Sequence, residues 1–370
     1  MEFLMGDTLL TILISLLVFG FLIFIHEFGH YITARIFKVT INEFSIGMGP
    51  KLVYYDSKKT GIRYSLAMLP IGGFVAMAGE DGDVTTGEDG QAKAIDDPNA
   101  FCKKPAWQRF IITSAGAFIN IVFGFLAMFI IVGSIRIGGT TVAVFPTAEE
   151  LAEHGEIDLS ERSEGQLLVG DVILEIEGNR VEIADEISYH IMRYGNEPID
   201  MRVLRDGVEI TLSDVSFPKL SSQEQVFGVM DFKVYEKEKD FLSFFSMTFR
   251  KTGLVLRMCY ESIYDLITGR YSVAAVSGPV GISSAIGDAM EGGQFLPVLN
   301  LVVIISINLG FMNLLPIPAL DGGRMLTIFI EMVTKKKLPP KVEATINAVG
   351  LMVLLGLSVL ILFKDIFTLF

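Results

Sequence analysis

Residues 9–30 read LLTILISLLVFGFLIFIHEFGH, an almost wholly apolar stretch that ends in His26-Glu27-Phe28-Gly29-His30. The apolar part is long enough to begin a helix that spans a bilayer. Three ionisable side chains at its inner end would be costly in hydrocarbon without a partner. Residues i and i+4 share one helix face, so both imidazoles can reach one zinc ion, with Glu27 beside them to take a proton from zinc-bound water. The alternative, two packing histidines and an unrelated carboxylate, is much less favoured at the end of a membrane span.

The composition indicates a polytopic membrane protein with a soluble insert. The chain has 370 residues, of which 51% are hydrophobic, and its mean hydropathy is +0.51. A net charge of −13 argues against nucleic-acid binding. The first span has no preceding basic region and no small-residue cleavage site, so we interpret it as a retained span and not a signal peptide. Two cysteines do not make a disulfide framework.

Four apolar segments predict membrane spans, at residues 8–33, 108–133, 295–315 and 346–363. Lysine and arginine are frequent in the loop after the first span and in the loop after the third, whereas the N-terminal tail has neither. The positive-inside rule therefore predicts that these two loops are cytoplasmic and that both termini lie outside. The HExxH end of the first span then faces the cytoplasmic side, and the long segment 134–294 is extracytoplasmic.

Three further segments have recognisable patterns. Residues 62–78 combine an alternating run, a Pro-Ile-Gly-Gly turn and a second apolar run, which predicts a β-hairpin beside the membrane; a small hairpin that merely packs is the alternative. In the external segment, residues 165–181 have a strand–turn–strand rhythm, 184–194 resemble a helix, and 201–215 form a hairpin with Asp206-Gly207 at its turn. Residues 241–270 are amphipathic and predict a helix at the membrane surface, with a plain core helix as the alternative.

A catalytic zinc usually takes three protein ligands and keeps one position for water. His154 and His190 lie in the external segment, on the far side of the membrane from His26 and His30. A carboxylate must therefore complete the site, and Asp321 is the best candidate, in Asn313-Leu-Leu-Pro316-Ile-Pro318-Ala-Leu-Asp321-Gly322-Gly323. The two prolines prevent regular helix and the glycine pair permits a tight turn at the cytoplasmic end of the third span. The alternative is an ordinary turn aspartate beside Arg324.

HEFGH in the first span together with NLLPIPALDGG in the third resembles the site-2 protease family of intramembrane zinc metalloproteases, in its bacterial anti-sigma-factor-cleaving branch of the RseP/RasP type. The resemblance covers nearly the full chain. GGFVAMAGE is similar to the membrane-associated β-hairpin of that family, and the external segment resembles one PDZ domain. Two features depart from the family pattern: Gly116-Ala117 stands where Gly-Pro is usual, and the stretch before the PDZ-like core is longer and more acidic.

The resemblance implies a role for each matching residue. His26, His30 and Asp321 would bind one Zn²⁺, with Glu27 as the general base. Asn308, Asn313 and the hairpin residues Gly72, Gly73, Phe74 and Val75 would bind the substrate backbone, although both asparagines are also suited to hydrogen bonding between helices. The PDZ groove is expected near Gly165, Gln166, Leu167, Leu168 and Val169.

The expected architecture is a polytopic α-helical membrane protein of four transmembrane helices, with a membrane-associated β-hairpin and an extracytoplasmic α+β PDZ domain. The predicted segments are 1–36 with HExxH, 37–106 as cytoplasmic loop, 107–133, the PDZ domain at 138–232, the surface helix at 241–270, 295–324 with LDGG, and 346–363.

The expected activity is zinc-dependent hydrolysis of peptide bonds in single-pass membrane substrates that an upstream site-1 protease has trimmed. An anti-sigma factor is the expected substrate, with signal-peptide remnants as a further class, in the inner membrane of a bacterial cell. A catalytically silent PDZ scaffold and a metal transporter are the rival hypotheses. The intact HExxH and Asp321 disfavour the scaffold, and the lack of polar residues in the second and fourth spans disfavours the transporter.

Overall fold

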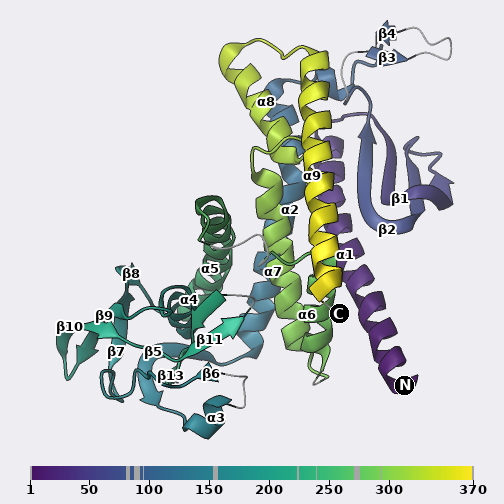
Figure 1. Cartoon of the computed structure of the whole chain (residues 1–370). Coiled ribbons are helices and arrows are strands. Elements are labelled where there is room, and N and C mark those ends of the chain that lie inside the picture. The colour runs from purple at the N-terminus through teal and green to yellow at the C-terminus, as the bar shows by residue number, and fades with distance from the viewer. Residues whose placement is uncertain are drawn as a thin grey trace. The chain divides into compact units, whose positions relative to one another are not determined.

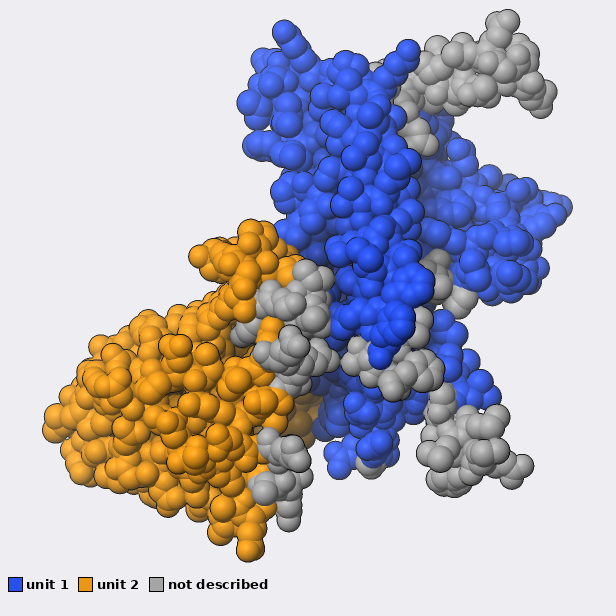
Figure 2. Space-filling view, in the orientation of Figure 1, with its two compact units in different colours: residues 1–127, 276–370 blue, residues 128–275 orange. Residues whose placement is uncertain are grey.

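The computed structural model describes residues 2–80, 84–86, 92–94, 96–152, 157–222, 225–238, 240–270, 276–291 and 293–368. The chain divides into two compact units (Figure 2). Unit 1 comprises Met1–Ala127 and Val276–Phe370, and unit 2 comprises Met128–Ala275. Each unit is described by itself.

Unit 1 is built mainly from long apolar helices, which run alongside one another in Figure 1. Its helices are α1 (Glu2–Ile36), the short η1 (Phe101–Lys103), the first part of α2 (Ala106–Ser134), α6 (Pro279–Met290), α7 (Phe295–Leu314), α8 (Asp321–Thr334) and α9 (Pro340–Thr368). Among the described residues, four stretches are long and apolar enough to cross a membrane: Leu9–Ile36, Ala106–Ser134, Phe295–Leu314 and Lys341–Asp365. They coincide with the four predicted spans, and many of their large apolar side chains are exposed, as lipid-facing surfaces require.

A curved sheet lies beside α1 in unit 1 (Figure 1) and consists of β1 (Ile41–Asp56) and β2 (Arg63–Met77). Both strands are long and fold back. Residues 41–46 of β1 pair with 73–77 on one side, and residues 43–46 pair with 63–66 on the other. Residues 51–56 pair with 63–67. The prediction of a self-contained hairpin over 62–78 is therefore wrong in its pairing. The two halves of that segment do not pair with each other, because the first part of β1 lies between them.

Residues 73–77 consequently form one side of this sheet. Within the described residues they pair only with 41–46. Beyond the sheet, β3 (Val84–Thr86) and β4 (Ala92–Ala94) make a separate two-stranded ladder. The face of the sheet toward α1 and α2 is apolar, with Phe44, Val75 and Ile112 in one buried cluster.

Unit 2 contains a six-stranded sheet and a small three-stranded sheet. Its elements after the end of α2 are β5 (Ile137–Val144), α3 (Ala148–Ala152), β6 (Ile157–Asp158), β7 (Val172–Ile176), β8 (Asn179–Arg180), α4 (Ala184–Tyr194), β9 (Ile199–Arg205), β10 (Val208–Val215), β11 (Lys219–Ser222), β12 (Gln225–Gly228), β13 (Lys233–Lys237) and α5 (Phe241–Thr268). The larger sheet has the order β10-β9-β7-β5-β13, with β8 paired to β7, and its core includes Ile173, Ile187 and Phe217.

Several local predictions in unit 2 are confirmed. The helix expected at 184–194 is α4, and β9 and β10 form the expected hairpin, with Asp206 and Gly207 at positive φ of 52° and 80° in its turn. The predicted end of the module at residue 232 is one strand too early. β13 begins at Lys233 and pairs with β5, so the sheet is complete only with this strand.

Helix α5 presents two different faces. Its charged side chains bind α4 and the turn before it: Arg193 bonds to Asp265 at 2.9 Å, and Arg250 to Glu186 at 2.7 Å. Large apolar side chains of α5, including Phe241, Phe249 and Ile267, are exposed. The helix at 241–270 is thus confirmed as amphipathic, while its position at a membrane surface stays a prediction.

Candidate metal centre

The C-terminal part of α1 supplies both histidines of the site. His26 and His30 are one helical turn apart and buried, and their Nε2 atoms lie 3.2 Å from each other. Both rings therefore converge on one point, as the i,i+4 spacing predicts.

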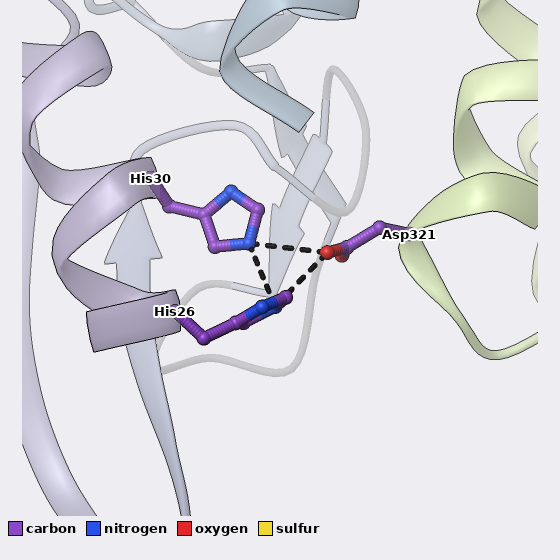
Figure 3. A group of neighbouring side chains, drawn as sticks. All are labelled: His26, His30 and Asp321. Carbon is purple, nitrogen blue, oxygen red and sulfur yellow. Dashed lines mark hydrogen bonds and ion pairs between the residues drawn. The ribbon is translucent and has the colours of Figure 1, made fainter. Parts of the chain in front are cut away.

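Asp321 reaches the same point from the first residue of α8 (Figure 3). Its Oδ2 lies 3.0 Å from Nε2 of His26 and 3.2 Å from Nε2 of His30. The chain between α7 and α8 carries Pro316 and Pro318 and passes through Ala319 at a φ of 71°, so the helix is interrupted as expected and restarts at Asp321. His26 and Asp321 are 295 positions apart in the sequence. Together with His30 they nevertheless form one cluster of candidate ligand atoms.

The geometry of this cluster fits a tetrahedral zinc ion. Bonds of about 2.0–2.1 Å to nitrogen and oxygen place tetrahedral ligands roughly 3.3 Å apart, close to the three separations above. Apart from these two ring nitrogens, the buried Oδ2 of Asp321 has no hydrogen-bond partner within the described residues. Two imidazoles and one carboxylate also leave a fourth position for water, as in catalytic sites.

Helix α2 holds the other nitrogen of each histidine ring. Nδ1 of His30 lies 2.8 Å from the carbonyl oxygen of Ile112, and Nδ1 of His26 lies 3.4 Å from the side-chain amide of Asn120. A histidine that binds metal through Nε2 carries its proton on Nδ1, so the amide oxygen of Asn120 is the group expected to accept it. These contacts fix the ring orientations and were not predicted from the sequence. In this part of α2 the sequence showed only Gly116-Ala117, where Gly-Pro is usual in the family.

Two glycines permit α1 and α2 to approach at this depth. A Cβ at Gly29 would meet the carbonyl oxygen of Ala115 at 2.5 Å, and a Cβ at Gly116 would clash with Nε2 of both histidines. A larger residue at either position would push the helices apart or displace the rings.

The metal cluster opens on a cavity of about 330 Å³ that is lined in part by β2. Glu27 lines this cavity with the three ligands, as do residues 73–77, Glu80, Thr113 and Arg324. Gly73 is so close to the helix that an added Cβ would lie 2.9 Å from Cγ of Glu27. The structure therefore brings together the predicted base, all three predicted ligands and the predicted substrate residues Gly73, Phe74 and Val75.

Other predicted site residues lie outside this cavity. A Cβ added at Gly72 would meet the side chain of Met48, Asn308 is exposed on α7, and Asn313 is half-buried near the end of the same helix. In unit 2, Leu167 belongs to the core, whereas Leu168 and Val169 are exposed. Gln166 hydrogen-bonds to the carbonyl oxygen of Asp214, and Gly165 has a positive φ of 99°. The roles of these residues in binding stay predictions.

The remaining histidines do not take part in the cluster. His190 is buried in α4 of unit 2 and stacks on Tyr194. Burial, helped by the charge of Arg257, lowers the pKa of His190 to about 4, so it is neutral at physiological pH. His154 lies outside the described residues.

Comparison with known proteins agrees with this geometry. The chain matches the family described as peptidase family M50 over residues 14–357. It is 34% identical over 365 residues to a protein of Fusobacterium nucleatum whose name assigns it provisionally to the zinc metalloproteases, covering 98% of this chain and 100% of that one. It is 30% identical over 431 residues to the zinc metalloprotease RasP of Geobacillus kaustophilus, covering 98% and 99% of the two chains. The chain therefore belongs to peptidase family M50, the site-2 protease family of zinc metalloproteases.

Proposed function

We propose that this protein is an intramembrane zinc protease that cuts peptide bonds within or near the transmembrane helices of single-pass membrane proteins. The observation that carries the proposal is the convergence of His26, His30 and Asp321 at the end of an apolar helix long enough to span a bilayer. When bound there, Zn²⁺ supplies Lewis-acid polarisation of a peptide carbonyl and lowers the pKa of a water.

The protein's own groups would then move the protons. Glu27 lies on the wall of the same cavity and is the group placed to take the proton from the attacking water. The same carboxyl group would later deliver a proton to the leaving amine. Burial of both histidines and their Nδ1 contacts with α2 keep the rings oriented during this cycle.

A helical substrate must unwind before it is cut, because its amides are protected by their own hydrogen bonds. Residues 73–77 offer a strand that pairs on one side only within the described residues, and they line the cavity. An unwound substrate segment would add to this strand by backbone hydrogen bonds and so lie beside Glu27. Asn313, and less directly Asn308, would bond to the opened backbone from α7.

Unit 2 would act outside the membrane as a PDZ-type module, together with α5 at the lipid surface. The family resemblance and the exposed apolar face of α5 support this assignment. In the proposed orientation both termini and unit 2 are extracytoplasmic, the metal lies toward the cytoplasm, and the membrane is the bacterial inner membrane. The expected substrate class is an anti-sigma factor already trimmed by a site-1 protease, with signal-peptide remnants as a second class.

The test is cleavage of a trimmed single-pass reporter by the purified protein in liposomes. Cleavage should stop when zinc is removed with a chelator and return when Zn²⁺ alone is added back. Normal metal binding without any cleavage of several single-pass reporters would favour the silent scaffold instead. Movement of zinc across the liposome membrane would favour the transporter.

A further inference from the structure

Arg324 lies one helical turn after the ligand Asp321 on α8 and binds Glu80, at the end of the β2 segment. One guanidinium nitrogen of Arg324 donates to Oε1 of Glu80 at 2.6 Å, and another donates to the backbone carbonyl oxygen of the same residue. The guanidinium also lies over the ring of Phe101, 5.2 Å from its centroid. Since a planar guanidinium makes both hydrogen bonds at once, this contact fixes direction as well as distance.

Glu80 is in turn tied to the last residue of β2. Its other carboxylate oxygen accepts from the backbone N–H of Met77 at 3.3 Å. The neighbouring Ala78 accepts from the backbone N–H of Phe101 at 2.7 Å. One carboxylate therefore links a metal-ligand helix to the strand that lines the cavity.

The pair also borders two cavities. Glu80 and Arg324 line the metal-site cavity and a second cavity of about 310 Å³. They are the residues shared by the two linings. Their side chains are 25% and 23% exposed, so the ion pair is partly shielded from water and less screened than a surface pair.

We propose that Arg324 and Glu80 are positioning residues that set the register of residues 73–77 against Asp321. This inference rests on the proposed function, because it concerns where a substrate strand on β2 places its carbonyl relative to the metal. Neither residue touches the reacting atoms. A shift of about 1 Å in such a placement can cost roughly 10²-fold in rate.

A matched ion pair on the same helix provides the control. Arg109 of α2 donates to Glu331 of α8 at 2.5 Å, with side chains 10% and 17% exposed. These two residues line the second cavity and are not among the residues that line the metal site. Breaking this pair removes a shielded ion pair from α8 but leaves the contact between Arg324 and Glu80 intact.

The experiment compares the single variants Arg324→Ala and Glu80→Ala, their double variant, Glu80→Gln, and the control Glu331→Ala in the full chain. Bound zinc, kcat and KM for a trimmed single-pass reporter are measured for each. We expect each alanine variant to lower kcat about 10- to 100-fold, with zinc content kept and KM changed much less. The double variant should be no slower than the slower single variant, because both remove one link.

Glu80→Gln keeps an Oε1 acceptor and the backbone carbonyl for Arg324. It replaces the oxygen that accepts from the Met77 N–H by an amide NH₂, so it should recover only part of the lost kcat. The proposal is overturned if the Arg324 and Glu80 variants lose zinc in parallel with activity, or if they cleave the reporter at the normal rate. It is also overturned if the losses of kcat in the two single variants multiply in the double variant, or if Glu331→Ala loses as much kcat as they do. Absence of cleavage by the unmodified protein is a different result, and it contradicts the proposed function itself.

Discussion

Asn120 of α2 contacts His26 on the ring nitrogen that faces away from Asp321, at 3.4 Å from Nδ1. Asn120 is fully buried, and its amide oxygen has no hydrogen-bond partner among the described residues as the amide is placed. If the side-chain amide is rotated by 180°, its oxygen faces Nδ1 and can accept a hydrogen bond from the Nδ1–H of a metal-bound His26. The two observations together indicate that the metal-bound state gives the amide oxygen of Asn120 a hydrogen bond that it otherwise lacks.

The first prediction concerns this contact. Asn120→Ala should lower zinc affinity by about 10- to 100-fold, the usual effect of removing a hydrogen-bond partner of a ligating histidine. Zinc titration of the purified protein measures it. Ser114→Ala on the same helix is the control, because within the described residues the Ser114 hydroxyl bonds only to the carbonyl oxygen of Ile111 in its own helix. Equal zinc affinity in the Asn120 and Ser114 variants would show that His26 needs no such partner.

The second prediction concerns the third ligand. Asp321→Ala should abolish stable zinc binding and cleavage while the protein still inserts in the membrane, because the described residues offer the two histidines no other carboxylate in their cluster. Metal analysis after purification measures it, with Asp288→Ala, an exposed aspartate on α6, as the matched control. Full zinc occupancy in the Asp321 variant would mean that the third ligand is misassigned.

The third prediction tests the close approach of the two helices. Gly116→Ala should lower zinc affinity by at least about tenfold, because the new methyl group would occupy the space of both Nε2 atoms. Gly20→Ala on α1 is the control, since nothing lies within 4 Å of a Cβ added there. If both alanine variants bind zinc like the unmodified protein, α2 can move away from the histidines at little cost.

The convergence of His26, His30 and Asp321 was predictable because the pattern that identifies them is local. The i,i+4 spacing of His26 and His30 fixes their common face, and the proline and glycine residues around Asp321 mark an interrupted helix. The partners on α2 were not predictable, since the rotation of one helix against another is decided by packing of distant residues such as Gly29 and Ala115. The pairing of β1 with β2 was missed for the same reason. Phe44 pairs with both Tyr64 and Val75, and the alternation of apolar and polar residues within 62–78 does not indicate which distant strand will pair there.

The fourth prediction concerns access to the site. Under the proposed function, unit 2 with α5 excludes substrates that still carry a bulky external domain. Residues 137–268 should be deleted together. If α5 were kept without the rest of unit 2, its Asp265 would lose Arg193 and its Arg250 would lose Glu186. We expect the deletion variant to cleave an untrimmed reporter at a rate similar to a trimmed one.

The rate for the trimmed reporter is the control and should not rise. A deletion variant that cuts the trimmed reporter normally and still ignores the untrimmed one would place the discrimination elsewhere, with residues 73–77 of β2 as the next candidate.

The most direct test of the account is Glu27→Gln, measured for both zinc content and peptide hydrolysis. Glu27 lies on the cavity wall beside the three ligands and is not among them. The account predicts about as much bound zinc as in the unmodified protein and a loss of hydrolysis of at least ~10²–10⁴-fold, because the amide cannot take the proton from the attacking water. Near-normal turnover of a trimmed single-pass reporter by the zinc-loaded variant would contradict it.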